Sequence, residues 1–150
     1  MASLRPVEVT VICVMAEPWA IDSWESKIAK ERRLRTAPDE VLIVAAVGAR
    51  EAIRMEAQNA VAALDADALI ADVTDGWTAW QLDGRDARSE FARLSALDLP
   101  ADGWVQGDVA RVAAKVIAEP GRILILVPSF WRDHLRDRIL ADTRAGEVSP

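Results

Sequence analysis

The sequence is poor in the residues with which enzymes most often do their chemistry. It has one cysteine, one histidine and no tyrosine in 150 residues. A single cysteine excludes an intramolecular disulfide, and we therefore expect Cys13, which lies in an apolar run, to be a buried thiol in a reducing compartment. His134 has no partner with which a catalytic set can be argued, and we expect a solvated helical residue. Clustered metal ligands are lacking too, and the sequence predicts no metal site.

Phosphate-binding patterns and blocks of positive charge are also missing. No glycine-rich phosphate loop occurs, and the net charge is −6. The basic residues are dispersed except in the segment 27–35, KIAKERRLR, which we interpret as a solvated helix face, with a basic docking patch as the alternative. We therefore expect no nucleic-acid partner, because phosphate binding needs a basic stripe. The apolar run 7–16 is too short and too polar for a membrane span, and a cytoplasmic protein is expected.

Tryptophan, by contrast, is abundant. The chain has six tryptophans but only two phenylalanines. Trp77 and Trp80 are three apart on an expected strand, so their side chains should point to opposite faces. Tryptophan is enriched at the buried centres of protein interfaces, and Trp77, Trp80 and Trp104 are our candidates for a partner interface. The alternative for each is an ordinary core or boundary residue.

The centre of the chain, residues 65–100, contains the clearest pattern of elements. Two apolar runs, at 68–71 and 77–82, lie on either side of Asp75-Gly76, which predicts a hairpin because this dipeptide favours a tight turn. A second turn at Asp83-Gly84 precedes a helix that carries apolar residues at helical spacing. Asp83 and Asp86 are placed to accept from free N–H groups at its start.

The remaining elements complete an α+β domain. We expect strands at 7–15, 41–47, 109–118 and 122–127, helices at 51–64 and from Ser129 onward, a possible helix at 21–34, a loop at 99–107 and a tail at 144–150. The turn Glu119-Pro120-Gly121 predicts that the last two strands form a hairpin, although the apolar spacing in 108–118 also fits a helix. The prediction is a single domain, 1–150, with a mostly antiparallel sheet built from split β-α-β units and helices on one face.

Two pairs of close carboxylates are the only candidates for acid–base chemistry. Asp65 with Asp67, and Asp72 with Asp75, could in principle divide acid and base roles. Each pair lies at a strand end or turn, where aspartate commonly stabilises the turn itself, and we favour that interpretation. The residues alone therefore favour a subunit or a binding module over an enzyme.

Six segments of residues 39–140 form an ordered set of motifs, and they are Asp39-Glu40-Val41-Leu42-Ile43-Val44, Asp72-Val73-Thr74-Asp75-Gly76-Trp77-Thr78, Leu82-Asp83-Gly84-Arg85-Asp86-Ala87, Leu97-Asp98-Leu99-Pro100, Gly107, and Val127-Pro128-Ser129-Phe130 with Leu135. In this order they resemble segments of the gamma subunit of heterotetrameric sarcosine oxidase. Residues 1–38 lie outside the match. The family is similar in fold to the folate-binding domain of glycine-cleavage aminomethyltransferases. The resemblance therefore implies the same fold for this chain.

The resemblance implies a non-catalytic subunit that packs against an alpha subunit, in a complex that also has beta and delta subunits. Such complexes convert sarcosine to glycine and hydrogen peroxide and pass a one-carbon unit to tetrahydrofolate. FAD, FMN, NAD and tetrahydrofolate are implied in the partner subunits and none in this chain. Two alternatives stay open: a folate-binding aminomethyl-transfer module in which Asp72 or Asp98 anchors the pterin, and a homo-oligomeric regulatory module.

Overall fold

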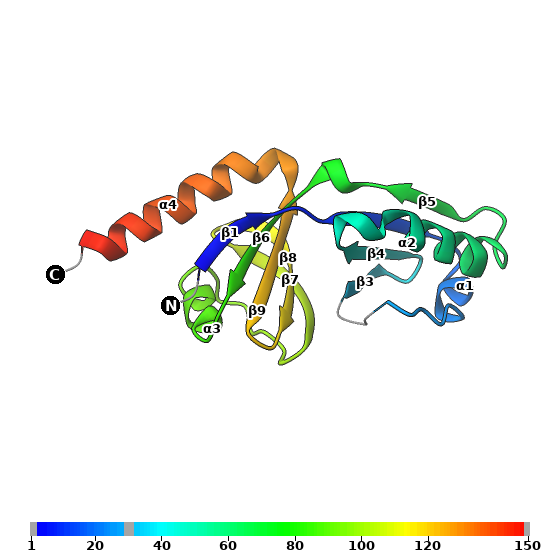
Figure 1. The fold of residues 1–150 in the computed structure, drawn as a ribbon, viewed down its shortest axis with the longest axis horizontal. Coiled ribbons are helices and arrows are strands. Elements are labelled where there is room, and N and C mark those ends of the chain that lie inside the picture. Colours follow the sequence, from blue (N-terminus) through cyan, green and yellow to red (C-terminus); the bar gives the residue numbers. More distant parts are fainter. Residues whose placement is uncertain (1–2, 29–31, 149–150) are drawn as a thin grey trace. The chain divides into compact units, whose positions relative to one another are not determined.

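The computed structural model describes residues 3–28 and 32–148, with side chains as far as Ala141 (Figure 1). The chain forms two compact units. The split unit consists of residues 1–7 and 76–150, and the inserted unit is the segment 8–75 between them. Each unit has its own sheet and its own apolar core. The sequence predicted a single domain. Whether the two units together form one domain stays a prediction.

The split unit contains a five-stranded antiparallel sheet with the order β1-β6-β9-β8-β7. Its elements are β1 (Ser3–Val7), β6 (Trp77–Asp83), α3 (Ala87–Ala92), β7 (Gly103–Val109), β8 (Val112–Glu119), β9 (Arg122–Pro128) and α4 (Arg132–Val148). A short 3-10 turn, Ser129–Trp131, leads into α4. The strands β8 and β9 form the hairpin that the sequence predicted. Gly121 adopts a φ of 72° in its two-residue turn, a value that glycine reaches without steric cost.

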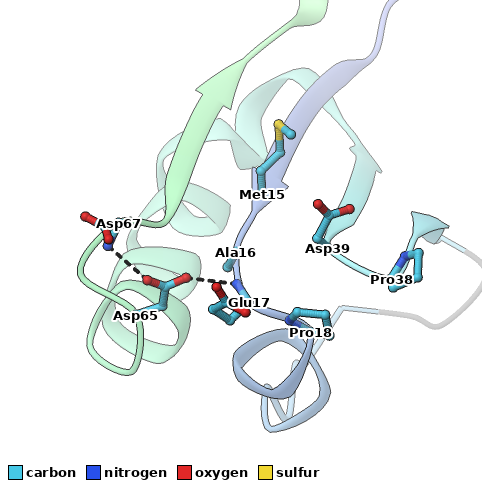
Figure 2. A pocket seen from close by; sticks show the side chains of 8 residues that line it. All are labelled: Met15, Ala16, Glu17, Pro18, Pro38, Asp39, Asp65 and Asp67. Atoms are coloured by element: carbon cyan, nitrogen blue, oxygen red, sulfur yellow. Dashed lines mark hydrogen bonds between the residues drawn. The ribbon is translucent and has the colours of Figure 1, made fainter.

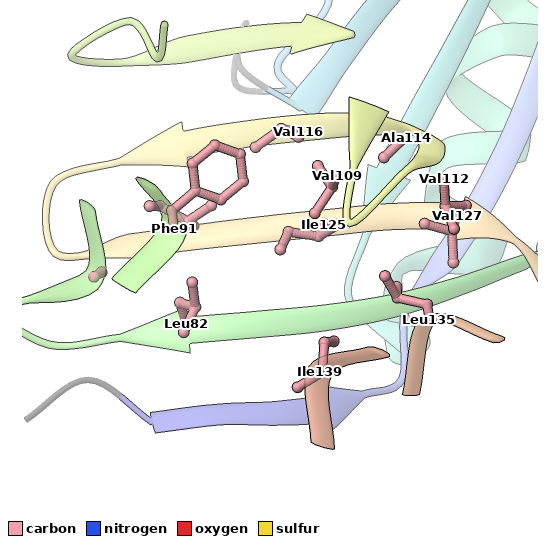
Figure 3. Packing of buried hydrophobic residues seen from close by; sticks show 12 residues of the cluster. Leu82, Phe91, Val109, Val112, Ala114, Val116, Ile125, Val127, Leu135 and Ile139 are labelled. Carbon is pink, nitrogen blue, oxygen red and sulfur yellow. The ribbon is translucent and has the colours of Figure 1, made fainter. Parts of the chain in front are cut away.

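One face of this sheet carries the core of the split unit (Figure 3). Alternate residues such as Leu82, Val116 and Ile125 point to this face, because side chains alternate along a strand. Phe91 of α3 and Leu135 of α4 pack onto the same cluster. Both helices therefore cover one face of the sheet, as the predicted fold class required.

The inserted unit contains a four-stranded antiparallel sheet with the order β3-β4-β2-β5. Its elements are β2 (Thr10–Met15), α1 (Pro18–Asp22), β3 (Arg33–Ala37), β4 (Glu40–Ala45), a 3-10 turn (Val47–Ala49), α2 (Arg50–Ala57), a π-helical turn (Gln58–Ala62) and β5 (Leu69–Asp72). Ile53, Ala57 and Val61 lie on the buried face of α2 and its extension, as the apolar spacing predicted. They pack against Ile12 and Ile43 of the sheet.

The hairpin predicted around Asp75-Gly76 is wrong. The strand β5 pairs with β2 of the inserted unit, whereas β6 pairs with β1 and β9 of the split unit. Asp75 and Gly76 lie in a 3-10 turn, Thr74–Gly76, at the boundary between the units. The two apolar runs do form strands, but distant strands supply their partners.

Three further sequence predictions need correction. The helix expected at 21–34 does not form as one element, because α1 ends at Asp22 and β3 begins at Arg33. Residues 29–31, which belong to the basic cluster, lie outside the described residues. The strand expected at 7–15 is divided between β1 and β2. The loop expected at 99–107 already contains the start of β7 at Gly103.

At the C-terminus, the backbone of α4 continues to Val148, where a tail from residue 144 was predicted.

Candidate functional site

The two residues most suited to nucleophilic or acid–base chemistry lie in different units. Cys13 is half-buried on β2, where burial and the nearby Glu40 carboxylate raise the pKa of its thiol. A raised thiol pKa keeps the sulfur protonated and weakly nucleophilic. His134 is exposed on α4, and its Nε2 lies 2.8 Å from Nε of Arg138, which donates to it. The prediction of a solvated helical histidine is confirmed.

Asp65 and Asp67 line an open pocket of about 540 Å³ in the inserted unit (Figure 2). One carboxylate oxygen of Asp65 accepts the backbone N–H of Glu17 at 2.8 Å, and the other accepts that of Asp67 at 2.9 Å. The Asp65 carboxylate therefore joins the segment after β2 to the turn before β5. This is the turn-stabilising role that the sequence favoured for these residues.

Asp72 also serves the local structure. Its Oδ1 accepts the backbone N–H of Thr74 at 3.0 Å, and its Oδ2 lies 2.9 Å from Nε of Arg50 in an ion pair without the angle of a directed hydrogen bond. The hydrogen bonds from Thr74, and to a smaller extent the Arg50 charge, lower the pKa of the Asp72 carboxyl. An ionised carboxylate with these partners stabilises the end of β5. It is not placed to act as a proton donor in catalysis.

Strand register places the three candidate tryptophans on two faces of the split unit's sheet. Trp80 pairs with Ile125, which faces the core, and its ring packs against the core cluster. Trp77 and Trp104 share the opposite face with Lys115, whose Nζ lies 5.7 Å from the centroid of the Trp77 ring. The prediction that Trp77 and Trp80 point to opposite faces is therefore confirmed, and all three rings are half-buried.

The most exposed aromatic group in the split unit is one that the sequence reasoning did not single out. Phe130 is 79% exposed and Trp131 is 40% exposed at the start of α4. Their ring centroids are 5.3 Å apart, and the Trp131 ring also contacts His134 edge-on at 5.5 Å. The sequence signal was the adjacent pair itself, since a helix with Leu135 and Ile139 inward leaves Phe130 outward.

A second pocket, of about 370 Å³, lies in the split unit, lined by Arg93, Leu94, Ala110, Arg111, Arg138 and Ala141. Its charge is opposite to that of the pocket in the inserted unit. Among the described residues, no three histidine, cysteine or carboxylate side chains gather as a metal site would require. None of the helices in the described ranges is long and apolar enough to cross a membrane.

Comparison with known proteins identifies relatives by structure only. No protein-family model matches the sequence, and no curated protein matches it. Among solved structures, the chain is similar to one from the heterotetrameric sarcosine oxidase of Corynebacterium sp. U-96, in complex with pyrrole 2-carboxylate. The TM-score is 0.77 and the identity 15%, over 99% of this chain and 87% of that chain.

The chain is also similar to the glycine cleavage system aminomethyltransferase T of Bartonella henselae. The TM-score is 0.67 and the identity 16%, over 95% of this chain but only 46% of the enzyme, so the chain spans about half of that protein. A weaker likeness, with a TM-score of 0.51, covers 27% of an aspartate kinase from Synechocystis. The chain therefore has the α+β fold shared by this sarcosine oxidase chain and by part of this aminomethyltransferase, as the motifs in its sequence predicted.

Proposed function

We propose that the chain is a non-catalytic gamma-type subunit of a sarcosine oxidase-like complex. The observation that supports this most is a match from end to end, which covers 99% of this chain and 87% of a chain from a heterotetrameric enzyme. A chain that matches a whole component of an assembly is more simply a component itself than a free enzyme. The motifs in residues 39–140 support the same assignment.

The alternative of a folate-binding transfer module has less support. It rests on the likeness to an aminomethyltransferase of which the chain spans about half. Its proposed pterin anchors belong to different units, with Asp72 in the inserted unit and Asp98 in the split unit. Asp72 is bound by Thr74 and paired with Arg50, and Asp98 is exposed in a loop. Neither residue lines the two pockets described above.

In the proposed complex the chain contacts an alpha subunit, with beta and delta subunits also present in the cytoplasm. FAD, FMN, NAD and tetrahydrofolate belong to the partners, and sarcosine oxidation occurs there. For the contact surface we propose Trp77 and Trp104, to which the exposure of Phe130 and Trp131 adds a second candidate. Trp80 is the weakest of the predicted interface residues because it packs against the core.

Purification of the tagged chain from its native cells tests the proposal. We expect larger chains to co-elute with a visible flavin absorption band. A colourless eluate that contains only this chain would contradict the assignment, and titration with tetrahydrofolate and measurement of self-association would then test the two alternatives.

Two matched variants locate the contact surface within the same experiment. Trp131→Ala removes an exposed ring of the split unit, and Trp19→Ala removes a still more exposed ring of the inserted unit. If the start of α4 is part of the contact, only Trp131→Ala reduces the yield of co-eluting flavoprotein. Equal yields for both variants would leave Trp77 and Trp104 as the proposed contact.

A further inference from the structure

Three arginines surround the pocket of about 370 Å³ in the split unit, each from a different element. Arg93 follows α3, Arg111 lies in the turn between β7 and β8, and Arg138 lies on α4. The rest of the lining is apolar, from Leu94, Ala110 and Ala141. Three segments that are distant in the sequence thus each contribute an arginine to one pocket whose other lining residues are apolar.

The positive charge of this pocket is largely uncompensated by the described residues. Arg111 is exposed and makes no hydrogen bond or ion pair with any of them. Arg138 donates to Nε2 of His134, a side chain that carries no negative charge. Among the side chains that the structure describes, the acidic group that pairs with a lining arginine is Glu90, 3.8 Å from Arg93. In a chain of net charge −6, this is a local concentration of the opposite sign.

The backbone holds Arg111 in a conformation that arginine rarely adopts. Ala110 and Arg111 have φ values of 48° and 66° in the two-residue turn between Val109 and Val112. Such turns favour glycine or asparagine, because at positive φ the Cβ of most other residues lies too close to the following carbonyl oxygen. The N–H of Ala110 donates to the carbonyl oxygen of Leu94 at 2.7 Å, which fixes the turn against the end of α3. Arginine at position 111 therefore does not stabilise the turn itself. This suggests that its guanidinium group serves a different role.

We propose that this pocket binds a small organic anion, with its carboxylate or phosphate group on the three guanidiniums and an apolar part over Leu94, Ala110 and Ala141. Guanidinium groups bind both kinds of oxyanion through paired, charge-assisted hydrogen bonds. The volume lies in the lower range of small-molecule pockets. This site is separate from the subunit role proposed above and does not depend on it.

Three ligands with the same ring and different head groups test the proposal on the full chain. Benzoate carries a carboxylate, phenyl phosphate carries a phosphate, and benzamide is the neutral control. At constant ionic strength, we expect at least one of the two anions to shift the amide resonances of Leu94, Ala110 and Arg111 in a saturable manner. Benzamide should leave these resonances unchanged, and the tighter of the two anions identifies the preferred head group.

Two variants separate the site from general charge effects. Arg111→Gly removes the guanidinium but suits the positive φ, so it should remain folded, with a thermal midpoint that is unchanged or higher. We expect it to weaken anion binding about tenfold, the loss of one charge-assisted contact. Arg85→Gly removes one positive charge elsewhere in the same unit and should change the affinity less than about twofold.

The proposal fails under any of three results. Neither anion gives a saturable shift at these residues, benzamide binds as well as the anions do, or Arg111→Gly binds as tightly as the unaltered chain. Arg138→Gln provides an independent check, because it removes a second charge without touching the turn, and it should also weaken binding.

Discussion

Both units of this chain have an apolar core, and they differ in the polar contacts that supplement it. The core of the split unit consists of apolar side chains on β6, β8 and β9, closed by Phe91 and Leu135. In the inserted unit, a side-chain hydrogen-bond cluster lies beside the apolar core. The buried Trp24 donates its indole N–H to Glu56 at 3.1 Å, and Glu56 also accepts from the Ser26 hydroxyl.

Connectivity explains this difference. The strands β7, β8 and β9 follow one another through two-residue turns, so apolar alternation and local turns are enough to align them. In the inserted unit, the described residues 23–28 after α1 lie outside the helices and strands, and specific polar contacts hold them instead. Among these, the guanidinium carbon of Arg33 lies 4.6 Å from the centroid of the Trp24 ring. We therefore expect truncation of core side chains to reduce the stability of the split unit most. Loss of side-chain hydrogen bonds should reduce the stability of the inserted unit most.

The largest expected effect is that of Phe91→Ala in the split unit. Phe91 is 1% exposed, and its truncation leaves a cavity that should lower the free energy of unfolding of this unit by about 3–5 kcal/mol. The matched control is Phe130→Ala, since Phe130 is 79% exposed and should change stability by less than about 0.5 kcal/mol. Urea titration followed by amide resonances of each unit gives both values, and equal losses for the two variants would contradict the packing described.

A smaller effect is expected from Glu56→Ala in the inserted unit. It leaves the Trp24 indole N–H and the Ser26 hydroxyl without their acceptor, which should cost about 1–3 kcal/mol. Glu51→Ala on the same helix removes only an exposed pair with Arg54 at 3.5 Å and should cost less than about 0.5 kcal/mol. If Glu56→Ala reduced the stability of the split unit by the same amount, the assignment of this contact to one unit would be wrong.

Gly107→Ala tests whether the loop after α3 is packed as tightly as the core. A Cβ at this position would collide with the side chain of Leu97. We expect a loss of about 1–3 kcal/mol from overpacking, less if Leu97 can move aside. A Cβ at Gly48 of the inserted unit meets nothing within 4 Å, so Gly48→Ala is the control and should change stability by less than about 1 kcal/mol. Adding Leu97→Ala to Gly107→Ala should recover part of the loss that is due to collision.

The smallest expected effects are on the loss of stability at low pH. Each unit has one carboxylate whose lowered pKa should contribute to that loss. Hydrogen bonds from Gln81, and further ones from Arg5 and Arg122, lower the pKa of Asp83 in the split unit. In the unfolded chain an aspartate titrates near 3.9. The folded state therefore holds its proton more weakly. This contribution to stability is complete above about pH 5 and is lost as the pH falls through the lower pKa of the folded state.

Asp83→Asn should make the urea midpoint of the split unit fall less steeply as the pH is lowered, and it should leave the inserted unit unchanged. Asp72→Asn should do the same for the inserted unit, because the pKa of Asp72 is also lowered. Each variant is the control for the other when midpoints are measured from pH 6 to pH 2. Both carboxylates are partly exposed, so the effects should be weaker than those of the substitutions above. An unchanged acid limb in both variants would show that neither ion pair contributes.

Local signals in the sequence predicted the elements but not all of their partners. Pro120-Gly121 identified the β8–β9 hairpin, because proline and glycine fit the dihedral angles of a tight turn. The turn at Ala110-Arg111 contains neither residue, and β7 before it is interrupted by Gly107, so both were missed. Asp75-Gly76 carried a stronger hairpin signal than either, yet the pairing of β5 and β6 with distant strands overrode it.

The candidate site shows the same limit. Turn roles for Asp65 and Asp72 followed from their positions at strand ends, and the structure confirms them. The pocket of Arg93, Arg111 and Arg138 could not be predicted, because its members come from three segments that only the tertiary fold brings together. Dispersed arginines in the sequence gave no indication that three of them would line one pocket.

The position of the inserted unit also governs the order of folding. In the split unit β1 pairs with β6, with Val7 opposite Ala79, so this pairing must close a loop of about 70 residues. Within the inserted unit, the N–H of Val73 donates to the carbonyl oxygen of Val11 at 2.9 Å, and Ile12 lies opposite Asp72.

Once the inserted unit is folded, the remaining loop has about 10 residues. Its length has then been halved nearly three times, which lowers the entropic free-energy cost of closing the loop by about 2 kcal/mol. The edge strand of the split unit therefore joins its sheet fastest after the inserted unit has formed, and a slowly folding inserted unit would delay it.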